Sequence, residues 1–106
     1  MNITWKEEEL KNLDTVASDE LVLFANNDST TYFNSIIQVE KMLDKKISNG
    51  SFIPEKAVIA FNHVMEFAAK RYCSEFGGTW YKVFTTGTRK SAAIEMTENF
   101  INDRNI

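Results

Sequence analysis

The chain has little of the chemistry that covalent cross-links, metal sites and nucleophilic catalysis need. Its 106 residues contain one cysteine, Cys73, and one histidine, His63. A single cysteine excludes an intramolecular disulfide and a cysteine-based zinc site. A metal site would therefore have to be built from carboxylates, and we expect neither a metal nor a cofactor.

Long apolar runs are also missing. No run approaches the ~18–20 residues of a membrane span. Residues 1–5 lead straight into charged residues instead of the apolar core of a signal peptide. We therefore expect a soluble, cytoplasmic protein with no membrane partner.

Proline and glycine are scarce, and they stand where helices begin and end. The only proline, Pro54, suits the first turn of a helix, where an amide hydrogen is not needed. Gly77 and Gly78 can adopt the positive φ that often follows a helix. Between them, apolar residues recur with helical spacing over a wide arc, which predicts a buried helix packed on two sides.

In the rest of the chain, apolar residues recur with the same helical spacing. No segment shows a convincing alternation of apolar and polar residues, which would be typical of a β-strand. With 43% hydrophobic residues, it can form a substantial core. We predict one all-α domain over residues 1–106, with Ser18 capping its second short helix. The three principal helices are expected at about 29–48, 54–76 and 88–103, with short helices near 5–13, 19–25 and 79–85.

The helical period also predicts which side chains point inward. Phe33 belongs to the apolar stripe of helix 29–48, and Trp80 and Phe84 are expected to anchor the 79–85 turn in the core. Phe52 and Ile53 are expected to pack beneath the central helix. On that helix the inward set is Ala57, Phe61, Val64, Met65, Phe67, Ala68 and Tyr72, extended by Val58, Ala69 and Phe76.

A catalytic site is not expected. A nucleophile needs a base within hydrogen-bonding reach, but Cys73 lies about 15 Å along the helix axis from His63. Cys73 is better explained as a small filler at the rim of the core. Glu95 and Glu98 share an exposed helix face, and no glycine-rich phosphate loop is present. We predict that the protein is not an enzyme.

The charges are unevenly distributed along the chain. The net charge is −3, yet residues 1–40 are acidic and residues 41–90 are basic. Either the two parts attract each other across the fold, or one charged face meets a partner. Arg89 and Lys90 sharpen this question, because cations in the first turn of a helix oppose its dipole. Their counter-charge is an acidic group of the N-terminal third, a phosphate backbone or an acidic partner protein.

The polar arc of the central helix is interrupted by Ile59 and Cys73. A sparse apolar spot on a charged face is either a contact for a partner or the place where the N-terminal helices lie. The residues predicted to bind a partner are Ile59, His63, Glu66, Lys70, Arg89 and Lys90. Nucleic-acid binding is the alternative, and it requires the basic groups on one face. Those groups are Lys41, Lys45, Lys46, Lys70, Arg71, Arg89 and Lys90.

The order of elements resembles a group of small, mostly uncharacterised phage-encoded all-helical proteins over about residues 20–95. The resemblance rests on Phe24-Ala25-Asn26-Asn27-Asp28, Tyr32, Gly50 to Ala57, Ala68 to Tyr72, Glu75-Phe76-Gly77, Trp80 and Arg89-Lys90. It implies a phage or prophage origin, a location in the host cytoplasm and no assigned activity.

Together these observations predict a small phage accessory protein that acts by binding a macromolecule, with a protein as the expected partner. Such a protein would inhibit or redirect a host or defence factor. Two alternatives stay open: a nucleic-acid-binding module that uses the basic 41–90 region, and a virion-associated or structural oligomer held together by the exposed apolar spot.

Overall fold

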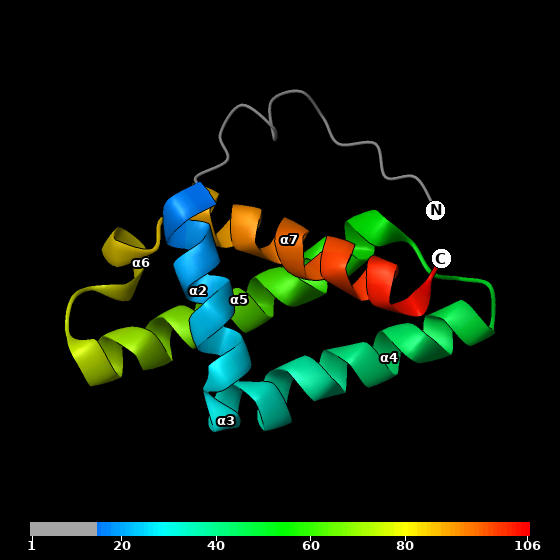
Figure 1. The fold of residues 1–106 in the computed structure, drawn as a ribbon, viewed down its shortest axis with the longest axis horizontal. Helices are drawn as coiled ribbons and strands as arrows, with labels where there is room; N and C mark the ends of the chain where they lie inside the picture. Colours follow the sequence, from blue (N-terminus) through cyan, green and yellow to red (C-terminus); the bar gives the residue numbers. More distant parts are fainter. Residues whose placement is uncertain (1–14) are drawn as a thin grey trace.

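The structure, a computed structural model, describes residues 15–106, which form only helices and the short segments that join them (Figure 1). The all-α prediction is therefore confirmed, while the helix predicted near 5–13 lies outside the described residues. In chain order the helices are α2 (Thr15–Asn27), α3 (Ser29–Thr31), the π-helix η1 (Tyr32–Ile36), α4 (Ile37–Ser48), α5 (Pro54–Phe76), α6 (Trp80–Val83) and α7 (Thr86–Arg104).

The central helix α5 begins and ends where its proline and glycines predict. Pro54 occupies the first turn after an extended Ile53. At the other end Gly77 and Gly78 have φ values of 91° and 98°, which favour glycine. A Cβ on Gly78 would also lie 2.8 Å from Val83 Cγ2, so this turn has no room for a side chain. The close turn returns the chain along α5 through α6.

Two helices cover α5. The later helix α7 runs beside it, and α2 crosses both (Figure 1). Phe61 of α5 and Phe100 of α7 are almost fully buried, with ring centroids 6.3 Å apart. Both helices also carry alanines with no exposed surface, which permit close approach of the backbones. These are Ala57, Ala68 and Ala69 on α5 and Ala92 and Ala93 on α7.

The start of α2 differs from the prediction. Ser18 does not cap a helix, because α2 already begins at Thr15. Ser18 is instead 3% exposed and accepts a hydrogen bond from the Ser91 hydroxyl of α7 at 3.2 Å. A residue type typical of helix caps therefore serves as a polar contact between two packed helices.

The helix predicted over 29–48 is present, but it contains a π-turn. The amide of Ile37 donates to the carbonyl of Tyr32, five residues earlier. The extra residue in this turn breaks the regular α-helical period. Phe33, placed inward by that period, is 61% exposed.

Two other aromatic residues of α5 are less buried than predicted. Phe67 is 36% exposed and Phe76 is 63% exposed, since α2 and α7 do not cover the whole predicted arc. Phe76 still contacts the ring of Tyr72, with centroids 4.8 Å apart. Ile53 is likewise exposed, whereas Phe52 packs against the core and Phe84 is 1% exposed, as predicted.

Asp28 ties the start of α3 to the later part of α5. Its carboxylate accepts hydrogen bonds from the Thr31 amide at 3.1 Å and from the Thr31 hydroxyl at 2.6 Å, as an N-cap does. It also accepts from Arg71 through Nε at 2.5 Å and Nη2 at 3.0 Å. The Arg71 guanidinium holds the pKa of this carboxyl well below its ordinary value, despite partial desolvation.

The Asp28→Asn variant keeps a capping acceptor but loses the charge that Arg71 binds. We expect it to lower the free energy of unfolding at pH 7 by about 1–2 kcal/mol, since charge-assisted hydrogen bonds are lost but Arg71 is partly exposed. Because the folded-state pKa is depressed, this stability is present above the ordinary value of 3.8 and is lost as the pH falls below it. Urea denaturation between pH 7 and 2.5, with the exposed Glu55→Gln as control, measures the difference. Equal stability of variant and wild type at pH 7 contradicts the account.

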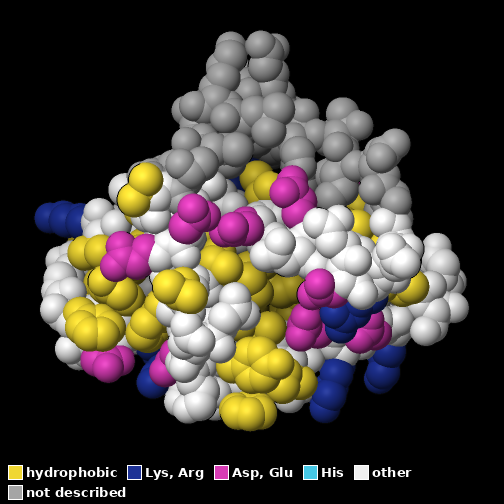
Figure 2. Space-filling view, viewed as in Figure 1, with side chains coloured by type: hydrophobic (Ala, Val, Ile, Leu, Met, Phe, Trp, Pro, Cys, Tyr) yellow, Lys and Arg dark blue, Asp and Glu magenta, His cyan; other side chains and the backbone are white. Residues whose placement is uncertain are grey.

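Acidic side chains meet where α2 crosses α7. Figure 2 shows several of them close together on this face. The prediction that Glu95 shares an exposed face with Glu98 is wrong, because α2 packs over this part of α7: Glu95 is partly buried, and its Oε2 has no hydrogen-bond partner among residues 15–106. Desolvation raises the pKa of Glu95, and so do Asp19, through its charge and a hydrogen bond, and the charge of Glu98. This contact is therefore unfavourable whenever all three groups are ionised.

The Glu95→Gln variant removes that cost. Because the folded-state pKa of Glu95 is raised, the wild type loses stability as the pH rises through it. We expect the variant to raise Tm at pH 7 by roughly 2–4 °C, with the advantage vanishing toward pH 4. Thermal unfolding at both pH values tests this, with the exposed Glu55→Gln as control. A fall in Tm at pH 7 would show that the ionised carboxylate supports the fold.

Candidate interaction surface

Trp80 joins the later part of α5 to the start of α7. It begins α6, directly after the Gly77-Gly78 turn. Lys70 Nζ and Arg89 Cζ each lie 4.8 Å from the centroid of its ring system. A cation over an indole ring at this distance is attracted by the negative face of the ring. Two basic groups that are far apart in the sequence therefore share one aromatic side chain.

Arg89 finds partners other than the acid expected for it. Its guanidinium donates to the Phe84 carbonyl at 3.1 Å and to the Thr86 hydroxyl at 3.3 Å. Within residues 15–106 it forms no ion pair with a carboxylate. The helix also begins earlier than predicted: Thr85 is the cap, and its hydroxyl accepts from the Thr88 amide at 3.3 Å. Arg89 thus lies beyond the first helical residues, where the dipole opposes it less.

A hollow of about 250 Å³ lies between the polar side of α5 and the start of α7. Ile59 at its edge is 61% exposed. The Oδ1 of Asn62 is buried and has no hydrogen-bond partner in the described part of the chain. The lining residues are Val58, Ile59, Asn62 and His63 from α5 and Thr86 and Lys90 from α7.

The hollow and the Trp80 contacts are connected. Thr86 lines the hollow and also accepts the hydrogen bond from Arg89. Glu66 lies one helical turn beyond Asn62 and pairs with Lys70 at 3.2 Å. All the residues predicted to bind a partner thus belong to one surface. We name it the Trp80 surface: Ile59, Asn62, His63, Glu66, Lys70, Trp80, Thr86, Arg89 and Lys90.

Three members of this surface were missed by sequence reasoning. Trp80 was assigned to the core, which it touches while remaining partly exposed. The sequence does offer one sign of its role: Trp80 stands in a short segment that joins α5 to α7, and such a segment must lie beside both helices. Asn62 and Thr86 carry no comparable signal, because their proximity depends on how the two helices pack.

Cys73 does not belong to the surface, although its helical position suggested so. It is 8% exposed, and its Sγ lies 4.0 Å from the position that a Cβ of Gly78 would occupy. Burial raises the pKa of its thiol. The prediction that Cys73 fills space at the rim of the core is confirmed.

The basic residues predicted for nucleic-acid binding fall into separate groups. Arg71 is bound by Asp28. Lys41, Lys45 and Lys46 are exposed along α4, which runs toward the opposite end of the molecule from α6 (Figure 1). Lys70, Arg89 and Lys90 remain as the basic part of the Trp80 surface.

In residues 15–106, no helix is long and apolar enough to cross a membrane. No group of three or more histidine, cysteine, aspartate or glutamate side chains is arranged there to hold a metal ion.

Comparison of the chain with protein-family models, with curated proteins and with solved structures finds no match.

The contacts of Arg89 imply a contribution to stability. We expect Arg89→Ala to lower the free energy of unfolding by about 1 kcal/mol, since it removes two hydrogen bonds and the contact with Trp80. Arg89→Lys keeps a cation but loses the pair of guanidinium hydrogen bonds. Its free energy of unfolding should therefore lie between those of the wild type and Arg89→Ala. Chemical denaturation measures these differences, with the exposed Lys82→Ala as control. Unchanged stability of Arg89→Ala would show that this side chain serves only an external partner.

Proposed function

We propose that this chain is a binding protein that recognises an acidic patch on another protein through the Trp80 surface. The observation that carries the proposal is the convergence of α5 and α7 on Trp80. The charged residues and the apolar Ile59 that the sequence analysis predicted to bind a partner lie close together there. They connect the hollow between α5 and α7 to the basic side chains around Trp80.

The chemistry of the surface suits a protein partner. Tryptophan and arginine are enriched among the residues that dominate binding energies at protein interfaces. Trp80 is already held by Lys70 and Arg89, so little side-chain freedom would be lost when a partner packs on it. Ile59 offers exposed apolar area at the edge of the hollow.

The charge of the surface argues for an acidic partner. Glu66, the one carboxylate of the surface, pairs with Lys70, whereas Arg89 forms no ion pair with a carboxylate of residues 15–106. Complementary potentials steer association and disfavour basic surfaces. The chain as a whole is acidic, with a net charge of −3, so a long phosphate backbone would be repelled away from this patch. A nucleic acid would also need a continuous basic track, whereas the α4 lysines lie at the far end of the molecule.

The resemblance to phage-encoded helical proteins suggests an origin but assigns no activity. Binding alone would be sufficient for a small accessory protein to inhibit or redirect a host or defence factor. We therefore propose a phage origin, action in the host cytoplasm and no catalytic step. A virion-associated oligomer would instead use the surface to contact a second copy.

Affinity capture with charge-reversal variants tests the proposal. The tagged wild type, Lys70→Glu and Ile59→Asp are used to capture proteins from lysates of cells that carry the gene. Lys45→Glu on α4 is the matched control, because it makes the same charge change on an exposed helix face. Circular dichroism establishes that each variant is folded.

We expect Lys70→Glu and Ile59→Asp each to lower the recovery of a captured protein about thirtyfold or more, since loss of an interface hot spot costs about 2 kcal/mol or more. Lys45→Glu should leave the recovery unchanged. Nuclease treatment should not change this result. Capture that depends on nucleic acid and is lost equally in Lys45→Glu would favour the nucleic-acid alternative. Capture unaffected by all three variants would contradict the proposal.

A further inference from the structure

The hollow between α5 and α7 has room for one side chain of another molecule. Its volume is about 250 Å³, and an enclosed apolar cavity of about 150 Å³ already takes up benzene. Val58, which is almost fully buried, lies at its base, and the exposed Ile59 lies at its edge. Thr86 and Lys90 form the α7 side of the hollow. An apolar group that enters the hollow therefore contacts both helices.

One polar group in the wall of this hollow is not satisfied by the fold. The Oδ1 of Asn62 is buried and has no hydrogen-bond partner among residues 15–106. An acceptor in this state destabilises a folded protein, so buried acceptors without a partner are rare. Packing within the described part of the chain therefore gives no reason for a polar residue at this position.

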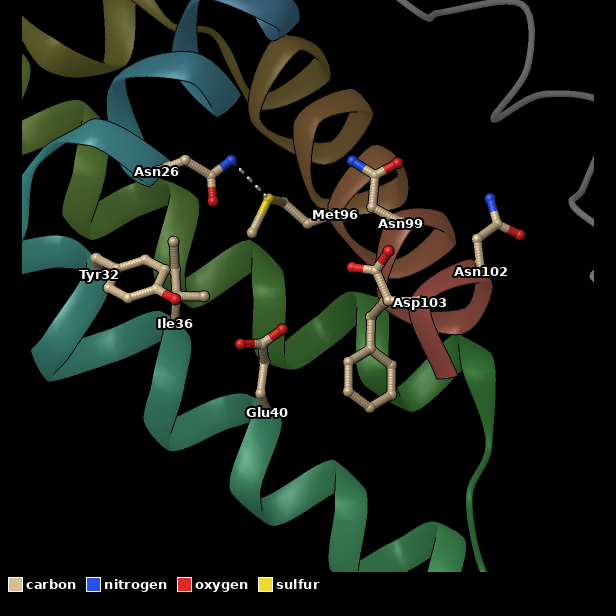
Figure 3. Close-up of a pocket in the computed structure, with 9 residues that line it drawn as sticks. Asn26, Tyr32, Ile36, Glu40, Met96, Asn99, Asn102 and Asp103 are labelled. Atoms are coloured by element: carbon tan, nitrogen blue, oxygen red, sulfur yellow. Dashed lines mark hydrogen bonds between the residues drawn. The ribbon is translucent and has the colours of Figure 1, made fainter. Parts of the chain in front are cut away.

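Another hollow, of about 340 Å³, lies where the end of α2, the η1–α4 segment and α7 meet (Figure 3). There Glu40 pairs with Arg104 at 3.6 Å, and the amide of Asn26 donates to the Val22 carbonyl at 3.0 Å. No buried side-chain nitrogen or oxygen of its lining lacks a hydrogen-bond partner within residues 15–106. The polar groups of this hollow are thus satisfied within the fold, unlike Asn62.

Cations border the α7 side of the hollow between α5 and α7. Lys90 lines it directly, and Arg89 donates to the hydroxyl of Thr86, another lining residue. The nearest carboxylate of the Trp80 surface, Glu66, is held by Lys70 at 3.2 Å. Carboxylates close to the entering group are therefore favoured, because they complement the charge of Arg89 and Lys90.

We infer that this hollow anchors an acidic segment of the partner. Such a segment places one large apolar side chain in the hollow and its carboxylates beside Arg89 and Lys90. An anchoring side chain in a pocket, surrounded by polar contacts, is the usual arrangement of an interface hot spot. The inference deepens the proposed function and rests on it. It adds a rule of specificity: an acidic segment without an apolar residue, or an apolar segment without carboxylates, binds weakly.

Three short peptides separate the two contributions. Acetyl-Glu-Glu-Leu-Glu-Glu-amide carries both features. A second peptide with alanine in place of leucine keeps only the charges, and a third with glutamine in place of every glutamate keeps only the leucine. Each peptide is titrated into the ¹⁵N-labelled full chain, and its dissociation constant is obtained from the amide shifts of Ile59, His63 and Lys90.

We expect the first peptide to bind best. Loss of the buried leucine should weaken binding about tenfold. The glutamine peptide should lose at least as much, and added salt should weaken binding of the first peptide by screening its carboxylates from Arg89 and Lys90.

Two variants of the protein locate the leucine. Asn62→Phe fills the hollow without changing a charge, and it should bind the leucine and alanine peptides equally. Asn34→Phe makes the same substitution at an exposed position of η1 and should keep the preference for leucine. Circular dichroism establishes that both are folded. Ile59→Ala, at an exposed position, should reduce the preference as well and serves as a second variant if Asn62→Phe does not fold.

Equal affinity of the wild type for the leucine and alanine peptides would overturn the inference. So would the absence of shifts at millimolar leucine peptide, or an unchanged preference for leucine in Asn62→Phe and Ile59→Ala. The proposed function is judged separately, because capture of a protein that is lost in Lys70→Glu and Ile59→Asp would support it even if the peptides do not differ.

Discussion

The packing of α5 between α7 and α2 is the constraint on which the rest of the structure depends. Fully buried alanines on α5 and α7 permit the helices to approach, and Phe61 and Phe100 fill the space between them. Because these contacts cover most of the apolar arc of α5, its polar arc faces outward, together with Phe67 and Phe76. The return of the chain through α6 then places the start of α7 beside that arc, and the Trp80 surface forms there.

Electrostatic contacts divide the basic residues into two kinds. Arg71 and Arg104 are each bound through two hydrogen bonds by an aspartate from a different helix, Asp28 and Asp44 respectively. These arginines hold α3 and α4 against α5 and α7. Lys70 and Arg89 lie instead over one partly exposed ring. The basic residues therefore differ in role according to their partners, which their positions in the sequence do not reveal.

Features that depend on local chemistry were predictable from the sequence. Pro54 and Gly77 marked both ends of α5, because their backbone preferences act within a few residues. The exposed Phe33 was not predictable, since it depends on a π-turn that α-helical periodicity cannot represent. Ser18 was misassigned because its partner lies 73 residues away. Six residues of the candidate surface could be selected from the sequence, but Trp80, Asn62 and Thr86 could not. That these residues form one surface was not predictable either, because the surface arises only when α5 and α7 pack.

Site-specific photocrosslinking in living cells tests most directly whether one face of the molecule carries its function. A photoreactive residue replaces Ile59 in the Trp80 surface or Tyr81 next to it, which are 61% and 54% exposed, or the exposed Lys41 or Lys45 of α4. The account expects a discrete crosslinked species, sensitive to protease and resistant to nuclease, from Ile59 and Tyr81 and none from α4. Crosslinks confined to α4, or equally strong from all four positions, would contradict it.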